Sequence, residues 1–97
     1  MITSTDLQRN YVKIFSLMRN YVWTFDIVEC LADLEVATYN AFINVEEVRR
    51  CFDRLKSLIR DVTRNDEELK EALDKFQSIL DLQEEYYYRI LKVQEAL

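Results

Sequence analysis

The feature that most constrains this chain is a double absence, because none of its 97 residues is glycine or proline. Average usage would supply about a dozen of these two residues together in a chain of this length. Glycine permits positive φ in tight turns and proline ends helices, so a chain without either is typical of nearly continuous helix. We therefore predict an all-α fold.

Histidine is missing as well, which removes the commonest general base and the commonest ligand for transition metals. Cys30 and Cys51 are too few for a zinc site without histidine, and we expect them to be buried thiols. A hairpin of the first two helices would also allow a disulfide between them. These absences predict a protein that is not an enzyme, with no catalytic residue, no cofactor and no metal site.

Apolar periodicity and capping signals divide the chain into three helices. We expect the first over about residues 5–38, where apolar residues recur at alternating steps of four and three. The second is expected over about 45–63, after a capping box formed by Asn44 and Glu47, and the third over about 66–96, after a capping box formed by Asn65 and Glu68. The apolar stripe of the first helix consists of Leu7, Tyr11, Ile14, Met18, Tyr21, Phe25, Val28 and Ala32.

These lengths predict a single helical domain over residues 1–97. The expected fold is a three-helix bundle with two long helices, one short antiparallel helix and coiled-coil-like packing. In the alternative, the first helix breaks near residue 22 and folds back, which would give a closed four-helix monomer. We favour the continuous helix because residues 20–24 contain no turn signal. Trp23 lies off the apolar stripe in this segment, and it either widens the core or marks a contact.

A short middle helix cannot cover two long neighbours, so both long helices should project apolar turns from opposite ends of the bundle. Soluble monomers rarely expose such patches, and we therefore expect interfaces with a second copy or with another protein. The run Tyr86-Tyr87-Tyr88 belongs to one projection, because three successive rings spread over about 200° of a helix and cannot all face one core. The candidate interface comprises Leu7, Tyr11, Ile14, Phe15, Met18, Tyr86, Tyr87, Tyr88, Ile90, Leu91, Val93 and Leu97.

Charge is distributed unevenly along the chain. Residues 20–48 carry six acids and no lysine or arginine, whereas residues 49–64 carry six bases against two acids. Antiparallel packing of the first two helices would set these stretches side by side and help to select the pairing. The basic stretch could instead contact nucleic acid, but the net charge of −5 argues against that partner.

The leading functional hypothesis is a non-enzymatic helical protein-interaction or structural subunit of a larger homo- or hetero-oligomeric assembly, such as a virus or phage particle or another multi-subunit complex. The alternative is a small acidic regulator that binds and blocks a target protein through Asp26, Glu29 and Asp33, which share a helix face. The longest apolar region, residues 21–45, is interrupted by acids that are costly in a bilayer, so we expect no membrane contact. The expected location is cytoplasmic, or the host cytoplasm or virion if the protein is viral.

Overall fold

The computed structural model describes residues 4–39 and 44–96, and these residues contain five α-helices and no strand. Four are long: α1 (Ser4–Met18), α2 (Phe25–Tyr39), α3 (Val45–Leu58) and α5 (Glu67–Ala96). A single turn, α4 (Arg60–Thr63), follows α3 directly. The predicted all-α fold is confirmed.

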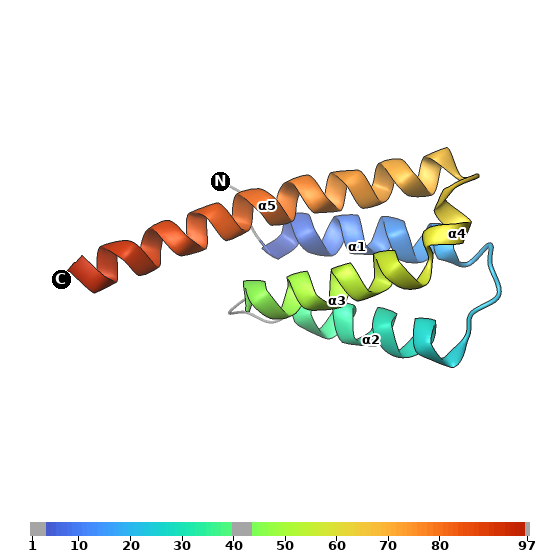
Figure 1. Ribbon diagram of the computed structural model, residues 1–97, viewed down its shortest axis with the longest axis horizontal. Helices are drawn as coiled ribbons and strands as arrows, with labels where there is room; N and C mark the ends of the chain where they lie inside the picture. The colour runs from blue at the N-terminus through green and yellow to red at the C-terminus, as the bar shows by residue number, and fades with distance from the viewer. Residues whose placement is uncertain (1–3, 40–43, 97) are drawn as a thin grey trace.

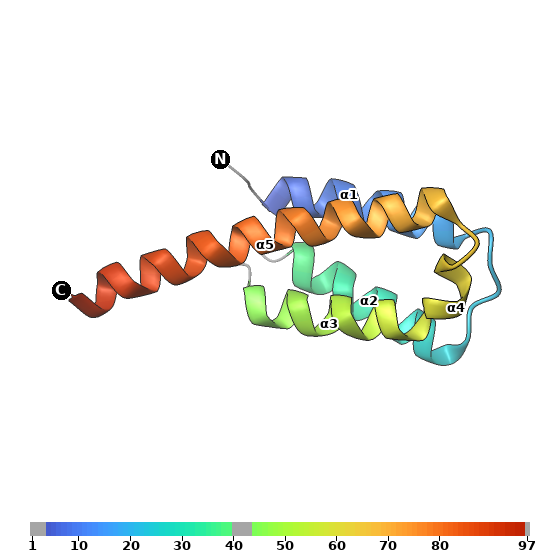
Figure 2. The same cartoon turned by 45° about the horizontal axis from the view of Figure 1, so that its top comes forward.

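The four long helices form an antiparallel bundle in which each helix lies beside two others. Figures 1 and 2 show α1 and α2 as one hairpin and α3 and α5 on the side next to it, with α5 returning along α1. The continuous first helix expected over residues 5–38 is therefore wrong, and so is the three-helix bundle built on it. The chain instead breaks near residue 22, as the alternative proposed, and folds back on itself.

The break between α1 and α2 is built without glycine. At the end of α1, the backbone N–H of Asn20 donates to the carbonyl of Leu17 at 3.2 Å, which tightens the last turn. The Trp23 indole N–H donates to the carbonyl of Met18 at 2.7 Å. The Thr24 hydroxyl then accepts from the N–H of Ile27 at 3.3 Å and so caps the start of α2. The side chains of Trp23 and Thr24 thus form hydrogen bonds with backbone groups at the end of α1 and the start of α2 that have no partner within their own helix.

The hairpin of α1 and α2 is held by polar contacts between its two arms as well as by apolar packing. The Tyr11 hydroxyl donates to the carbonyl of Leu31 at 2.9 Å, and the Gln8 side chain donates to the carbonyl of Thr38 at 3.2 Å. Burial raises the pKa of Tyr11 above its ordinary value. The two helices therefore have a defined register.

The core runs between all four long helices. Phe52 of α3 and Phe76 of α5 are both fully buried, and their ring centroids lie 4.6 Å apart. The helices α1 and α2 contribute ten buried residues to the core: Leu7, Tyr11, Ile14, Leu17, Met18, Ile27, Cys30, Leu31, Leu34 and Ala37. The predicted stripe therefore lies in the core up to Met18, but its continuation after the break does not.

The starts of the later helices follow their expected positions closely. Asn44 caps α3 as predicted, since its side chain accepts from the N–H of Glu47 at 3.2 Å. The cap of α5 is Asp66, which accepts from the N–H of Leu69 at 3.0 Å, so the prediction that Asn65 caps this helix is wrong by one residue. Asp66 also accepts from the hydroxyl of Tyr21, which ties the break to the start of α5.

The second helix expected over 45–63 is interrupted once. Ile59, with φ −109° and ψ 17°, ends α3 and precedes α4, and its side chain is fully buried. Ile59 therefore contributes its side chain to the core at the residue where the helix is interrupted.

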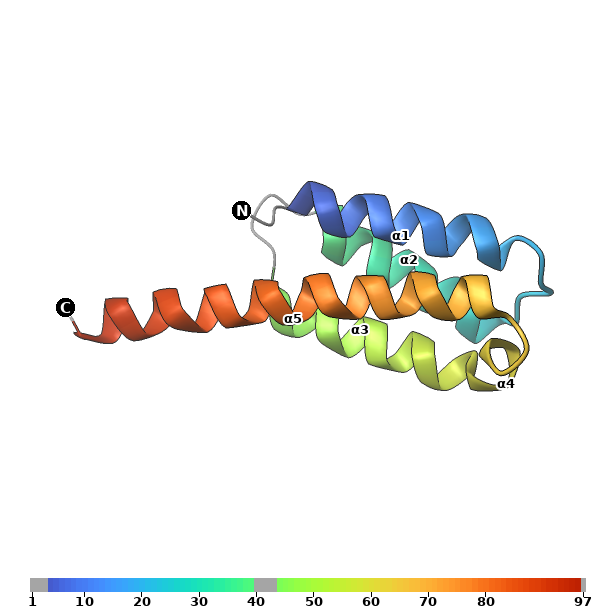
Figure 3. The same cartoon turned by 90° about the horizontal axis from the view of Figure 1, so that it is seen from above.

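The helix α5 is twice as long as α1 or α2, with 30 residues against 15 in each. At 1.5 Å per residue this corresponds to about 45 Å against about 22 Å. Figure 3 shows the C-terminal turns of α5 extending past the other helices into open space. One of the two projections expected from the sequence is therefore present.

Replacement of Trp23 tests the construction of the break. Trp23→Ala removes the N–H donor to Met18 and the ring that packs edge-on against Phe15 at 5.3 Å. We expect the free energy of unfolding to fall by roughly 2 to 4 kcal/mol in urea titrations, because the change leaves both a void and an unpaired carbonyl. The neighbouring Val22 is 93% exposed, and Val22→Ala should cost less than about 0.5 kcal/mol. Equal losses in the two variants would contradict this role.

Asp66 should make stability depend on acid. The hydrogen bond from Tyr21, followed by those from the backbone, holds the pKa of Asp66 below its ordinary value. The charged form therefore stabilises the fold above the unfolded pKa, and this stabilisation is lost as the pH falls through the folded pKa. Asp66→Asn should lower the urea midpoint at pH 7 and flatten its decline below about pH 4. Asp61→Asn, at an exposed residue of α4, should change neither; an unchanged profile for Asp66→Asn would contradict the assignment.

Candidate protein-interaction surfaces

The N-terminal half of the expected interface is used inside the chain itself. Leu7, Tyr11, Ile14 and Met18 are buried, because α1 packs on α2 and α5 instead of projecting. Phe15 is half-buried beside them. The expectation that these five residues form a projecting apolar surface is therefore wrong, and its cause is the break after α1.

In the C-terminal half of the expected interface, Tyr86, Tyr88, Ile90 and Val93 are exposed on α5. Leu82, which the sequence analysis omitted, is exposed on this helix as well. We refer to four exposed residues of this helix as the α5 stripe: Leu82, Tyr86, Ile90 and Val93. Each residue advances the helix by about 100°, so these four side chains lie within about 80° of one another around the helix axis.

The other expected residues of α5 divide between the bundle and solvent. Tyr87 is half-buried against the core, and the ring of Tyr88 packs edge-on against it at 5.4 Å. Partial desolvation and the nearby carboxylates of Glu46 and Glu84 raise the pKa of Tyr88. Leu91 is half-buried, and Leu97 lies outside the described residues. The tyrosine run thus spreads over both environments.

A second apolar surface lies along the outside of α2, and the sequence analysis missed it. Phe25 is 79% exposed and Val36 is 65% exposed. We refer to five exposed residues of this helix as the α2 stripe: Phe25, Val28, Ala32, Val36 and Tyr39. Helical geometry places these side chains within about 80° of one another around the axis of α2. The apolar periodicity of the sequence places Phe25, Val28 and Ala32 in the core stripe of a continuous helix. It therefore gives no indication that these side chains are exposed.

The acids of the expected acidic face lie beside the α2 stripe. Asp26, Glu29 and Asp33 are all exposed. Asp26 and Glu29 form ion pairs with Arg54 of α3 at 3.9 and 3.4 Å. The predicted pairing of the acidic and basic stretches is thus present through this arginine.

The other arginines at the start of the basic stretch pair elsewhere. Arg49 reaches α5, where its guanidinium lies 2.5 Å from both Asp81 and Glu84. Arg50 pairs with Glu47 on its own helix. The ion pairs of the described residues therefore link α3 to both of its neighbours, instead of to α2 alone.

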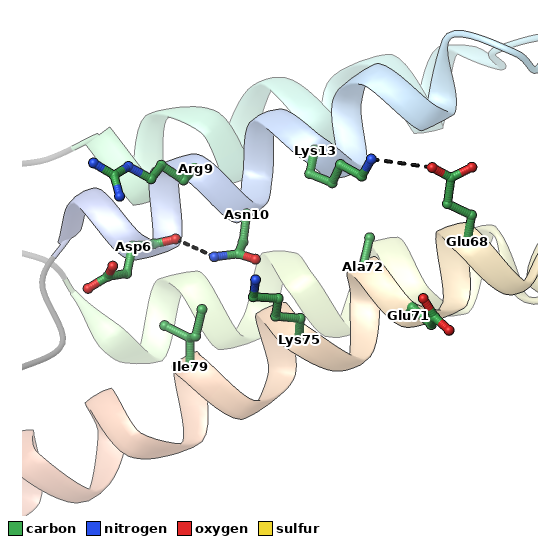
Figure 4. Close-up of a pocket in the computed structure, with 9 residues that line it drawn as sticks. All are labelled: Asp6, Arg9, Asn10, Lys13, Glu68, Glu71, Ala72, Lys75 and Ile79. Carbon is green, nitrogen blue, oxygen red and sulfur yellow. Dashed lines mark hydrogen bonds and ion pairs between the residues drawn. The ribbon is translucent and has the colours of Figure 1, made fainter.

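A groove of about 550 Å³ separates the outer edges of α1 and α5. Lys13 of α1 points across it to Glu68 of α5 at 3.3 Å, as Figure 4 shows. Both side chains are more than half exposed, and the walls carry three acids and three bases. The groove is an open, charge-balanced surface lined by Asp6, Arg9, Asn10, Lys13, Glu68, Glu71, Ala72, Lys75 and Ile79.

The cysteines are buried, free thiols as predicted. The Cys30 thiol donates to the carbonyl of Cys51 at 3.3 Å. Burial raises the pKa of Cys51 to about 11, and burial raises that of Cys30 as well. Both sulfurs therefore remain protonated near neutral pH, which disfavours nucleophilic chemistry.

Within residues 4–39 and 44–96, no cluster of three or more potential ligands could hold a metal ion. No helix in this part of the chain is both long enough and apolar enough to cross a bilayer. Comparison with family models, with curated proteins and with solved structures finds no match to this chain.

Proposed function

We propose that this chain is a non-enzymatic helical subunit of a larger protein assembly and that it docks on a neighbouring protein through the end of α5. The observation that carries this proposal is the α5 stripe, which lies on a helix extending beyond the bundle. Each apolar side chain that such a contact removes from water stabilises the complex by about 25 cal/mol per Å². A projecting apolar helix end is typical of helix-in-groove recognition.

The helical form of the projecting end supports the proposal. Isolated helices shorter than about 12 residues are marginal in water, and most helical stability in proteins comes from packing of an apolar face. Toward the C-terminal end of α5, an exposed ion pair joins Glu85 to Arg89 at 2.5 Å, and such a pair contributes only a few tenths of a kcal/mol. Docking on a partner would supply the packing that this segment lacks within its own bundle.

The side chains of the α5 stripe suit a protein partner. Tyr86 combines a large apolar ring with a hydroxyl group, and tyrosine is enriched at residues that dominate binding energy. Ile90 and Val93 supply branched apolar surface beside it. A partner with an apolar groove would bury all three at once.

The alternative function is a small acidic regulator that blocks a target protein through Asp26, Glu29 and Asp33. Two of these carboxylates already face Arg54, which lowers the charge that they offer to a partner. The assembly subunit is therefore the better supported proposal.

The proposal is tested by the mass of the native complex that contains this chain in its source cells. Native mass spectrometry should give a mass well above the 11.7 kDa of one chain. A variant with Tyr86, Ile90 and Val93 all changed to serine should shift most of the protein to the single-chain mass, because it removes the apolar contact.

The matched control is Val22→Ser, which changes an exposed apolar residue in the connection between α1 and α2. Figure 1 shows this connection at the end of the bundle opposite the C-terminus. It should leave the mass of the complex unchanged. Recovery of the wild-type chain only at 11.7 kDa, or equal effects of the two variants, would overturn the proposal.

A further inference from the structure

The α2 stripe lies on a helix that is apolar on two opposite sides. In α2, Ile27, Leu31 and Leu34 pack inward, yet Phe25 and Val36 are largely exposed on the outer side. A surface helix normally presents one apolar face to the core and a polar face to solvent. A helix with two apolar faces is typical of one that is covered on both sides.

The α2 stripe is symmetric about its central residue, Ala32. The steps along the stripe, from Phe25 to Tyr39, are three, four, four and three residues. The side-chain types follow the same symmetry, because an aromatic ring stands at each end and a valine, Val28 or Val36, comes next on each side. A surface that is the same in both chain directions fits an antiparallel copy of itself, which is the condition for a two-fold, isologous contact.

An antiparallel pair centred on Ala32 brings like side chains together. Residues equally far from Ala32 on the two copies then lie at the same height, so Phe25 meets Tyr39 of the second copy and Val28 meets Val36. Aromatic pairs of this kind add stabilisation beyond the area that they bury. At the centre Ala32 meets itself, and two small side chains allow the helix axes to approach to about 8 Å.

A hollow beside Tyr39 gives the outer surface a shape that suits this pairing. It measures about 100 Å³, lies between α1 and α2, and is lined by Tyr11, Val12, Phe15, Glu35 and Tyr39. A cavity of about 150 Å³ admits a whole benzene ring, so this hollow has room for much of one. The antiparallel pairing brings the exposed ring of Phe25 from the second copy to Tyr39, at the rim of the hollow. Each copy thus offers an exposed ring at one end of α2 and a hollow at the other.

The area of the α2 stripe is sufficient for a weak dimer. An aromatic side chain buries about 150 to 250 Å² when it is fully enclosed, so Phe25 and Tyr39, at 79% and 49% exposure, offer roughly 200 to 300 Å² per copy. Val28, Val36 and the neighbouring Val12 of α1 are each about half exposed and raise this area to roughly 450 Å². Two copies would therefore cover about 900 Å² of apolar surface before the polar rim is counted, and specific interfaces bury at least about 1,000 Å² in all. We expect a Kd on the order of 100 µM.

We propose that two copies of this chain pair through the α2 stripe as an antiparallel, two-fold dimer with Ala32 at its centre. The inference goes beyond the proposed function, because it concerns a surface other than the α5 stripe. Figure 1 shows α5 extending past the end of the bundle at which α2 finishes. The antiparallel dimer therefore carries its two α5 ends at opposite ends, and it offers the proposed docking helix to two neighbours.

Sedimentation equilibrium tests the dimer. The average mass of the wild-type chain should rise from 11.7 kDa toward twice that value as the concentration approaches about 300 µM. Val28→Ser with Val36→Ser should hold the mass at 11.7 kDa, whereas the control, Tyr86→Ser with Ile90→Ser, should leave the dimer intact. All four residues are exposed, so thermal unfolding followed by circular dichroism should show both variants folded. So weak a dimer dissociates at the low concentrations at which native complexes are weighed.

Disulfide crosslinking tests the register and the direction of the pairing. A residue on the two-fold axis lies opposite itself, so Ala32→Cys should form a disulfide-linked dimer under mild oxidation. Val28→Cys and Val36→Cys should each fail alone, because equivalent residues lie about 12 Å apart and a disulfide needs Cα atoms within about 7 Å. An equimolar mixture of these two variants should crosslink. Val22→Cys, at an exposed residue outside α2, is the control for random collision, and the native thiols are buried.

The acids of α2 determine how this dimer responds to salt. A two-fold axis sets each flank of α2 against the same flank of the second copy, so Glu29 of one copy faces Asp33 of the other. Arg54 lies 3.4 Å from Glu29 and offsets part of this repulsion. Salt screens the remainder, so raising NaCl from about 50 mM to about 300 mM should strengthen the dimer.

Replacement of Asp33 tests the same flank without a change of solvent. Asp33→Lys sets a lysine against Glu29 of the second copy, and two symmetric ion pairs should strengthen the dimer at least about threefold. The control, Asp61→Lys, makes the same charge change on α4 at a side chain that is 93% exposed, and its effect should be smaller. A dimer that weakens as salt is raised, or equal effects of the two variants, would contradict this arrangement of the flanks.

Several results would overturn the inference. A wild-type chain that stays at 11.7 kDa up to about 300 µM would reject the dimer, and loss of the dimer in the α5 variant alone would place the contact on α5. Crosslinking of Val28→Cys with itself would reject the antiparallel direction. Absence of crosslinks both in Ala32→Cys and in the mixed sample would reject the centre at Ala32. None of these results bears on the proposed docking of α5, which is tested by the mass of the complex in source cells.

Discussion

The break between α1 and α2 determines how the other helices pack in this bundle. In a chain without glycine or proline, the reversal is made by side chains, with Trp23 donating to the carbonyl of Met18 and Thr24 capping α2. Tyr21 adds a contact to Asp66 at the start of α5. These interactions turn one potential long helix into a hairpin.

The break divides a single apolar stripe into two parts with different surroundings. Before it, Leu7, Ile14 and Met18 enter the core. After it, the chain resumes in a new helical phase, so Phe25 and Val28 face outward while Ile27 and Leu31 take their place. The hairpin thereby buries the surface of α1 that would have projected and exposes a new one along α2. Over its last turns α5 extends past the other described helices.

Much of the fold could be predicted because its signals are local. The absence of helix-breaking residues predicts the fold class, and the Asn44 cap predicts the start of α3. Unequal helix lengths predict the projecting end of α5 and the exposure of Tyr86, Ile90 and Val93. Whether these residues bind a partner remains a prediction, as does the absence of catalysis.

The rest could not be predicted because it depends on tertiary contacts. At the end of α1, the indole N–H of Trp23 donates to the carbonyl of Met18 while its ring packs against Phe15. Apolar periodicity carries no information about such a contact. The heptad pattern crosses the break without interruption, so it assigned Phe25, Val28 and Ala32 to the core. Thr24 followed by Asp26 was the available signal for a new helix, since a capping hydroxyl and an early acid mark helix starts.

In this structure, residues 5–39 form a hairpin that turns one apolar stripe outward. The most direct measurement is the distance between nitroxide labels at Thr5 and Val36, attached by a chemistry that leaves Cys30 and Cys51 unmodified and read by pulsed electron resonance. The two labelled residues are exposed and lie near the same end of the hairpin. Packed helices lie about 8 to 10 Å apart, so the hairpin predicts a distance between the labels below about 25 Å. A distance near 45 Å, the length of 31 residues in one continuous helix, would contradict it.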